Sequence, residues 1–169
     1  MNMVEATLER RNGGMSAKLG SQSVTLGDEA VSARPAIKRF EGKKVILGIR
    51  PEDLEDADLA SEVPPDRRLR GKVELREALG SEVMVHFRID ARPALTEDVR
   101  ELARDVGDER AVQDEGAEET TMVGRFGARS RVSLAEETEV AVDTHALHFF
   151  DPETGLGIYD ETSERKGDR

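Results

Sequence analysis

The sequence predicts a mostly β protein made of OB-like small barrels, with one short helix and an acidic loop insertion. Short β-type segments recur at a spacing of roughly ten residues, with Gly or Pro between them. Hydrophobic residues make up 37% and aromatic residues 4% of the chain, against 36% charged residues, which is typical of thin β-layers with solvated faces. We expect one domain over residues 1–160, with the insertion at about 91–121 and a disordered tail at 161–169.

Charge and composition exclude several classes of function. The 36 acidic and 25 basic residues give a net charge of -11, which disfavours attraction to nucleic acids or anionic lipids. The absence of cysteine removes disulfides, thiol catalysis and thiolate metal sites together. No apolar run approaches the ~20 residues that a bilayer-spanning helix needs, and no secretory pattern follows Met1. These observations predict a cytoplasmic protein.

The first forty residues contain a predicted hairpin and a further short strand. Met3–Arg10 alternates in part, and Asn12-Gly13 then supplies the positive φ of a tight turn into Met15–Leu19. A short strand is expected at Ser23–Leu26. Val31–Phe40 shows no clear period, so we expect a loop there, with at most a short strand.

The stretch VILGIRPEDL, residues 45–54, changes character half-way. Lys44–Ile49 is apolar and β-branched, as in a covered strand. Pro51 ends that strand and suits the first turn of a helix, while Glu52 and Asp53 suit the positive end of that helix. Arg50 and Glu52 have two interpretations: a surface ion pair worth roughly 0–1 kcal/mol, or a device that holds a turn at a domain or subunit boundary.

The second half predicts more β structure, interrupted by the insertion. Leu69–Ala78 and Glu82–Ile89 flank a Leu-Gly-Ser turn and form the clearest predicted hairpin. The acidic, proline-ended stretch Asp56–Asp66 before it is expected to be a linker or a surface loop. Residues 95–106 have apolar side chains at helical spacing, and the acidic residues 107–120 are expected to form a mobile loop. Later β-segments are predicted at residues 122–126, around Val132 and Leu134, around Val140 and Val142, and in a strand-turn-strand unit at 146–159.

No catalytic or metal-binding motif stands out. The three histidines, His86, His145 and His148, lack cysteine partners and an HExxH element, so packed histidines are expected rather than ligands. Neither a G-x-S-x-G elbow nor a G-x-x-x-x-G-K-[ST] loop occurs. An OB barrel that binds single strands needs aromatic rings in a basic groove. Here the surface is acidic, so we predict no nucleic-acid partner. The rings best suited to stacking are Phe87, Phe126, Phe149, Phe150 and Tyr159, and the four phenylalanines are expected in the core.

Three stretches, taken together and in order, resemble a known family. They are LGIRPEDL (47–54), VELREALGSEVMVHFRI (73–89) and VAVDTHALHFFDPETGLGI (140–158). They are similar to the C-terminal regulatory region, or transport-associated OB domain, of the ATP-binding subunits of carbohydrate ABC importers of the maltose, trehalose and glycerol-3-phosphate type. Met1-Asn2 resembles the seam where the nucleotide-binding domain meets that region. The resemblance implies that the Walker A, signature and Walker B motifs lie upstream of this chain.

The resemblance also implies a role, partners and signature residues. It implies a regulatory and dimerisation domain without ATPase activity or a cofactor of its own, since ATP and magnesium would bind in the nucleotide-binding domain. The implied partners are a second copy of this chain, that domain, the membrane permease subunits and, in some members, a regulatory protein, at the cytoplasmic face of the membrane. The signature residues are Gly48, Arg50, Pro51 and Glu52 at the barrel rim, Gly80 and Glu82 at a second turn, and His148, Phe149 and Asp151 at the closing strand.

Two features depart from the family pattern, and two other functions stay open. Residues 91–121 are longer than the compact members need, and SLAEETEVAV (133–142) lacks the expected glycine turn of the R-x-G-D kind. One alternative is a sensor of small oxyanions, like related barrels in molybdate transport, which would need a glycine-lined, positive pocket at an interface. The other, weaker alternative is a free OB module for nucleic acid, which would need a basic groove.

Overall fold

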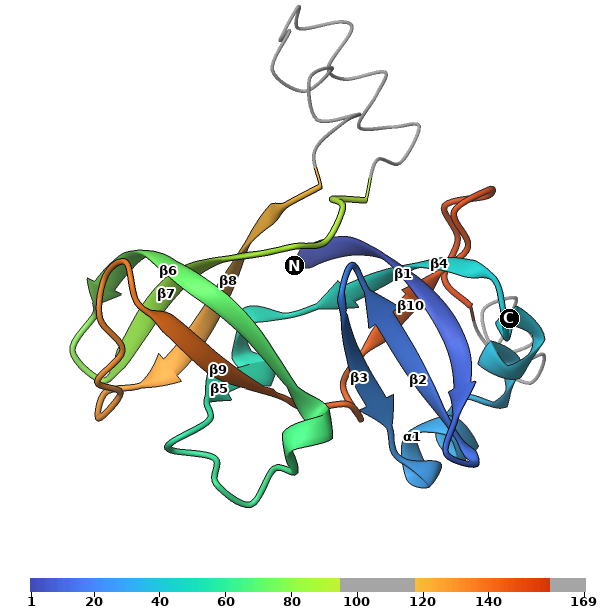
Figure 1. The fold of residues 1–169 in the computed structure, drawn as a ribbon, viewed down its shortest axis with the longest axis horizontal. Coiled ribbons are helices and arrows are strands. Elements are labelled where there is room, and N and C mark those ends of the chain that lie inside the picture. The colour runs from blue at the N-terminus through green and yellow to red at the C-terminus, as the bar shows by residue number, and fades with distance from the viewer. Residues whose placement is uncertain (95–117, 159–169) are drawn as a thin grey trace, which may run out of the picture.

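The structure is a computed structural model that describes residues 1–94 and 118–158, and its strands form two five-stranded antiparallel sheets (Figure 1). The elements are β1 (Asn2–Arg11), β2 (Gly14–Leu19), β3 (Gln22–Leu26), α1 (Asp28–Ala33), η1 (Pro35–Phe40), β4 (Lys44–Ile49), η2 (Pro51–Asp53), β5 (Leu54–Asp56), η3 (Pro65–Arg67), β6 (Arg68–Ala78), β7 (Glu82–Ile89), β8 (Thr120–Gly127), β9 (Glu137–Val142) and β10 (His148–Phe150).

The first sheet has the strand order β10-β4-β1-β2-β3. Asn12 and Gly13 have φ angles of 51° and 82°, as a two-residue turn between β1 and β2 requires, so the predicted hairpin is confirmed. In β4 every residue from Val45 to Ile49 is buried. This confirms the covered strand that its continuous apolar sequence predicts.

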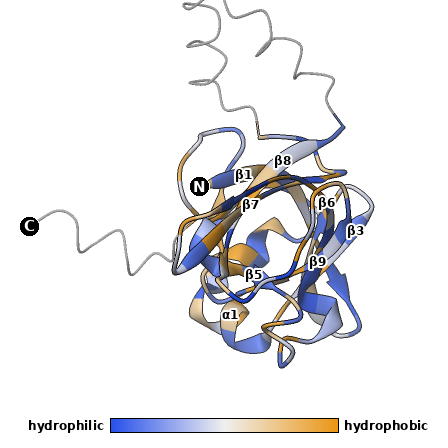
Figure 2. Cartoon of the chain, turned by 90° about the vertical axis from the view of Figure 1, so that its left-hand side faces the viewer, coloured by the Kyte–Doolittle hydropathy of each residue, from blue (hydrophilic) through white to orange (hydrophobic). Residues whose placement is uncertain are grey.

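The second sheet has the order β5-β9-β6-β7-β8 and curls until its first and last strands approach each other (Figure 2). A side chain makes the closing contact: the Glu55 carboxylate accepts hydrogen bonds from the Gly127 N–H, with N–O distances of 2.9 and 3.1 Å. Along β7 the buried residues alternate, with Val83, Val85 and Phe87 facing inward. The mostly β, barrel-like architecture that the sequence predicts is therefore confirmed.

The buried residues described in the two sheets form one hydrophobic cluster. Leu47 of β4 and Leu54 of β5, on either side of the passage between the sheets, are both almost fully buried. Phe87 and Phe126 pack with tilted rings whose centroids lie 6.5 Å apart. Full burial of a side chain of this size contributes roughly 1.5–3 kcal/mol, so the two sheets share a main source of their stability.

The prediction for residues 31–40 is wrong, because this stretch is helical. α1 and η1 cover most of it, and Pro35 occupies the first turn of η1, where its fixed φ is suitable. Ala30 and Ile37 are the buried anchors of the two helices. Each helix has six residues, which is too short to show a recognisable helical period in the sequence.

Other differences are smaller. No strand forms around Val132 and Leu134 in the described loop between β8 and β9, and the last predicted strand is reduced to one bridge between Phe150 and Gly157. The predicted linker or surface loop begins inside β5 at Asp56. This residue is only 4% exposed, and its carboxylate accepts a hydrogen bond from the Ser130 hydroxyl at 2.6 Å. The predicted helix at 95–106, most of the acidic segment at 107–120 and the tail at 161–169 lie outside the described residues.

The turn before β9 holds Ala135 at a φ of 67°, in the stretch where the family pattern has a glycine turn. A left-handed conformation costs an L-residue about 1–2 kcal/mol, whereas glycine loses roughly 0.5–1 kcal/mol in chain entropy. We therefore expect Ala135→Gly to raise the free energy of unfolding by up to about 1 kcal/mol, measured by urea denaturation. The control Ala78→Gly, at an exposed end of β6, should lower it by about 0.5 kcal/mol. Equal losses at both positions would contradict this account.

Candidate functional site at the junction of the two sheets

The Arg50-Pro51-Glu52 stretch carries the chain from the first sheet to the second. β4 ends immediately before Arg50, and β5 follows Asp53. Pro51 opens η2, and the Asp53 N–H donates to the Arg50 carbonyl at 3.0 Å. The predicted helical turn is thus present as a short 3-10 helix. We call residues 50–53 the first crossover.

The side chains of Arg50 and Glu52 are both exposed, and no ion pair joins them in the described part of the chain. The surface ion pair is therefore not supported. Their turn connects the two sheets and so lies at a boundary. That the two side chains hold this turn stays a prediction.

A second crossover, residues 143–147, returns the chain from β9 to β10 in the first sheet. The Asp143 N–H donates to the Asp53 carbonyl at 2.9 Å, so the two crossovers are bonded directly to each other. Thr144 and Leu147 are buried, with 2% and 1% of their surface exposed. The two crossovers therefore bring residues about ninety positions apart in the chain into one site.

β10 places two of the predicted signature residues, His148 and Phe149, beside β4. His148 pairs with Gly48, and Phe149 is buried in the core. A Cβ atom at Gly48 would lie 3.1 Å from Cε2 of Phe150 and 3.3 Å from Cβ of His148, distances that are tighter than ordinary van der Waals contact. Glycine at this position therefore permits the close approach of β10.

The other predicted residues serve turns away from the crossovers. The Asp151 carboxylate accepts a hydrogen bond from the Glu153 N–H at 2.9 Å, which fixes the turn after β10. Gly80 has a φ of 88° at the tip of the β6–β7 hairpin, and Glu82 forms an ion pair with Arg125 at 3.4 Å. This tip lies at the far end of the second sheet from β10 (Figure 1). Gly80 and Glu82 are thus not part of the junction.

Two titratable groups at the junction have shifted pKa values. The pKa of His148 is lowered from its ordinary 6.5, first by burial and then by the Arg50 guanidinium. The pKa of Asp53 is raised from 3.8, first by burial and then by the carboxylates of Glu52 and Asp143, with Arg50 opposing the rise. Burial therefore disfavours the charged form of each group, and Arg50 acts on both.

Asn2 is a structural residue of the junction that the sequence reasoning did not identify. Its Nδ2 donates to the Ile49 carbonyl at 3.0 Å and to the Val123 carbonyl at 2.9 Å, and its Oδ1 accepts from the Val123 N–H at 2.7 Å. One side chain thus joins β4 of the first sheet to β8 of the second. The only sequence signal was the likeness of Met1-Asn2 to the family seam, which assigned no contact to the side chain.

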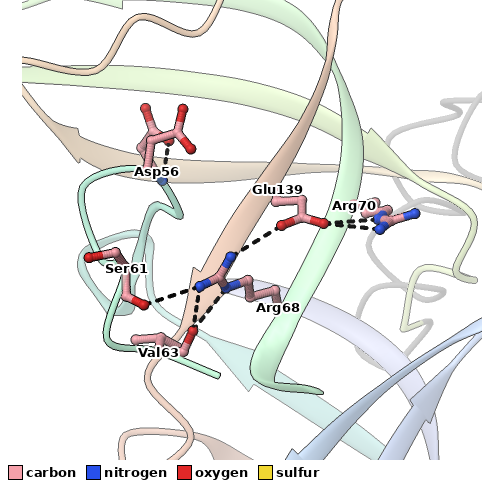
Figure 3. A network of polar contacts seen from close by, with 7 residues as sticks. Asp56, Ser61, Val63, Arg68, Arg70 and Glu139 are labelled. Carbon is pink, nitrogen blue, oxygen red and sulfur yellow. Dashed lines mark hydrogen bonds and ion pairs between the residues drawn. The ribbon is translucent and has the colours of Figure 1, made fainter. Parts of the chain in front are cut away.

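A loop of residues 57–67, which we call the covering loop, lines a cavity together with the two crossovers. Arg68 fixes this loop (Figure 3). The Arg68 guanidinium donates to the Val63 carbonyl at 2.6 and 2.9 Å and contacts Glu139 at 3.3 Å. Arg70 contacts the same carboxylate at 3.0 Å. Hydrogen bonds from Arg70 and then Arg68 lower the pKa of Glu139, so the loop is fastened to a carboxylate that stays ionised at neutral pH.

Two kinds of feature are absent from the described residues. Residues 1–94 and 118–158 contain no group of three or more His, Cys, Asp and Glu side chains arranged to hold a metal ion. No helix within the same ranges has the length and apolar character needed to cross a bilayer.

Comparison with known proteins gives two family matches that meet at the first crossover. Residues 1–54 match the MalK OB fold domain, and residues 47–117 match the TOBE domain. The chain belongs to the MalK OB fold and TOBE domain families. The two matches overlap at residues 47–54, so the family boundary coincides with the passage from the first sheet to the second.

Relatives of this MalK-type OB and TOBE chain are much longer proteins. It is 35% identical over 121 residues to the trehalose/maltose import ATP-binding protein MalK of Thermococcus litoralis, covering 71% of this chain and 25% of the relative. It is 30% identical over 141 residues to the oligosaccharides import ATP-binding protein MsmX of Bacillus subtilis, covering 83% of this chain and 31% of the relative. It is 30% identical over 150 residues to the trehalose import ATP-binding protein SugC of Mycobacterium tuberculosis, covering 84% of this chain and 36% of the relative. The chain thus spans a quarter to about a third of these relatives.

We predict that Asn2→Ala lowers the free energy of unfolding by about 2 kcal/mol, because it leaves partly buried backbone groups of Ile49 and Val123 unpaired. Chemical denaturation measures the change. The control Thr7→Ala alters another partly buried polar residue of β1 and should cost less than about 1 kcal/mol. Equal costs for the two variants would show that the bridge between the sheets is unimportant.

We predict that Arg50→Ala raises the pKa of His148, because it removes a nearby positive charge. Because the folded pKa of His148 lies below the unfolded value of 6.5, the unfolded state binds a proton first, and stability is lost as the pH falls from 6.5 through the folded pKa. The variant should therefore lose less stability than wild type when the pH is lowered below 6.5. NMR titration of the imidazole measures the pKa. The control is Arg131→Ala, which removes an exposed arginine from the loop between β8 and β9. An unchanged His148 titration in Arg50→Ala would contradict the prediction.

Proposed function

We propose that this chain is the C-terminal regulatory domain of the ATP-binding subunit of a sugar importer. The observation that carries the proposal is the meeting of the two family matches at the first crossover. The three relatives described above are all named as sugar-import ATP-binding proteins. We expect ATP and magnesium to bind in a nucleotide-binding domain of the subunit, and we expect no ATP hydrolysis by the residues of this chain.

The proposed role determines the partners. The domain would contact the nucleotide-binding domain of its own subunit and act with the membrane permease subunits at the cytoplasmic face of the membrane. A regulatory protein would be a further partner of such a domain. We also propose that two copies of the domain associate and hold two ATP-binding subunits together.

We propose that self-association uses the surface of the second sheet around the exposed end of β6. Leu75 in β6 and Leu79 just after it are 45% and 57% exposed, and β6 is exposed at every position from Glu74 to Ala78. Leu134 is 62% exposed and precedes Ala135, whose N–H donates to the Val73 carbonyl of β6. We call these three leucines the apolar patch. A second copy of the same patch would cover them.

The structure provides less support for the alternative functions. An oxyanion sensor needs a positive pocket, whereas the cavity beside the crossovers has five carboxylates and one arginine in its walls: Glu52, Asp53, Glu55, Glu62, Asp143 and Arg67. A nucleic-acid module needs exposed stacking rings, whereas Phe87, Phe126 and Phe149 are buried. No specific observation therefore favours either alternative.

Sedimentation velocity of this chain over a range of concentrations should show a reversible dimer. Leu75→Glu and Leu79→Glu should each weaken it by about tenfold or more, because each places a charge in the apolar contact. The control Leu156→Glu changes a leucine that is 69% exposed outside the patch and should leave the dimer unchanged. A monomer at every concentration would contradict self-association. A dimer that all three variants leave intact would contradict the patch.

A further inference from the structure

A cavity of about 390 Å³ lies between the covering loop and the two crossovers. This volume lies within the range of roughly 300–1,000 Å³ that is usual for small-molecule sites. The described residues that line it include no Phe, Tyr or Trp side chain, and the His145 imidazole is their one ring. Its apolar wall is aliphatic and is formed mainly by Leu54, Val63, Pro64, Ala141 and Val142.

Three of the residues that line this cavity each have a buried polar side-chain atom without a partner. In the described part of the chain, three buried side-chain atoms have no hydrogen-bond partner: Oδ2 of Asp53, Nε of Arg67 and Oγ1 of Thr144. All three residues line this one cavity, although they come from the first crossover, from η3 and from the second crossover. An unpaired buried polar group costs about 1–3 kcal/mol. Three of them around one cavity indicate a missing partner rather than three separate packing defects.

The types of these atoms restrict the chemistry of that partner. A carboxylate accepts, the Nε–H of arginine donates, and a hydroxyl does both. A molecule that satisfies all three must therefore donate and accept hydrogen bonds at several points. Hydroxyl groups do this without carrying charge, and the C–H groups between them can lie against the aliphatic wall.

Charge and hydrogen bonding disfavour the main competitors. The five carboxylates in the wall disfavour an anion. They would attract a polyammonium cation, but such a cation has no acceptor for the Nε–H of Arg67. The described residues also contain no cluster suited to a metal ion. A nucleobase would find no Phe, Tyr or Trp ring in the described lining on which to stack, only the His145 imidazole.

We propose that this cavity binds a small uncharged polyol of monosaccharide size. Asp53 accepts a hydrogen bond from one ligand hydroxyl, Arg67 donates to a second, and Thr144 pairs with a third. Because the three unpaired atoms are buried in the unliganded chain, side-chain rotation accompanies binding. The inference concerns the cavity alone and does not depend on the proposed importer role or on self-association.

The test is an NMR titration of the backbone amides of this chain with four neutral polyols: D-glucose, trehalose, myo-inositol and glycerol. At least one of the four should cause saturable shifts, with a dissociation constant on the order of 1 mM or lower. The shifts should be confined to the two crossovers and the covering loop. Sodium sulfate and spermidine serve as the anionic and cationic probes.

Two variants show whether the named side chains act. Thr144→Val keeps the shape of the residue but removes the unpaired hydroxyl. It should weaken binding about tenfold without lowering the thermal stability of the unliganded chain. Arg67→Met should weaken binding similarly, and Thr138→Val, a control in β9 outside the cavity wall, should bind like wild type.

Three outcomes would overturn the proposal. One is the absence of saturable shifts with all four polyols at about 50 mM, far above the expected dissociation constant. Another is shifts at the cavity with sulfate or spermidine only. The third is polyol binding that Thr144→Val and Arg67→Met leave unchanged, which would place the ligand elsewhere on the chain.

Discussion

The hydrogen bond from the Asp143 N–H to the Asp53 carbonyl is the constraint on which the arrangement depends, because it joins the two places where the chain passes between the sheets. A chain that crosses once leaves its two sheets linked by a single flexible connection. Here the return through residues 143–147 adds β10 to the edge of the first sheet beside β4. The first and last described strands, β1 and β10, thereby belong to one sheet, and the second sheet is held between two fixed connections.

Polar contacts reinforce this junction because apolar packing alone does not determine the angle between two sheets. Asn2 links β4 to β8 with one side chain, and Glu55 closes the second sheet onto Gly127. Arg68 fastens the covering loop through the Val63 carbonyl and Glu139. Each contact is directional. Together they explain how a chain with few aromatic residues and 36% charged residues holds a defined orientation between its two halves.

Most strands could be predicted from the sequence because their burial repeats with period two or is continuous, as in β7 and β4. The helices α1 and η1 could not, because six residues contain fewer than two helical turns. The residues of the first crossover and of β10 were predicted as members of one family pattern, yet their meeting depends on the bond between Asp53 and Asp143, which no local pattern encodes. Asn2 and Thr144 were missed for the same reason. Their roles arise from contacts with segments distant in the sequence.

The position of the cavity follows from the same topology. Side chains in the middle of a strand have neighbours on both sides, whereas side chains at a crossover have neighbours only where another segment happens to pass. Asp53 and Thr144 sit in the two crossovers, and Arg67 lies where the covering loop enters β6. The shared core buries them, but the sheets offer them no regular hydrogen-bond partners. In this chain the double crossing therefore creates a polar, partly enclosed space at the junction, and the side chains at these few positions determine whether that space holds water or a ligand.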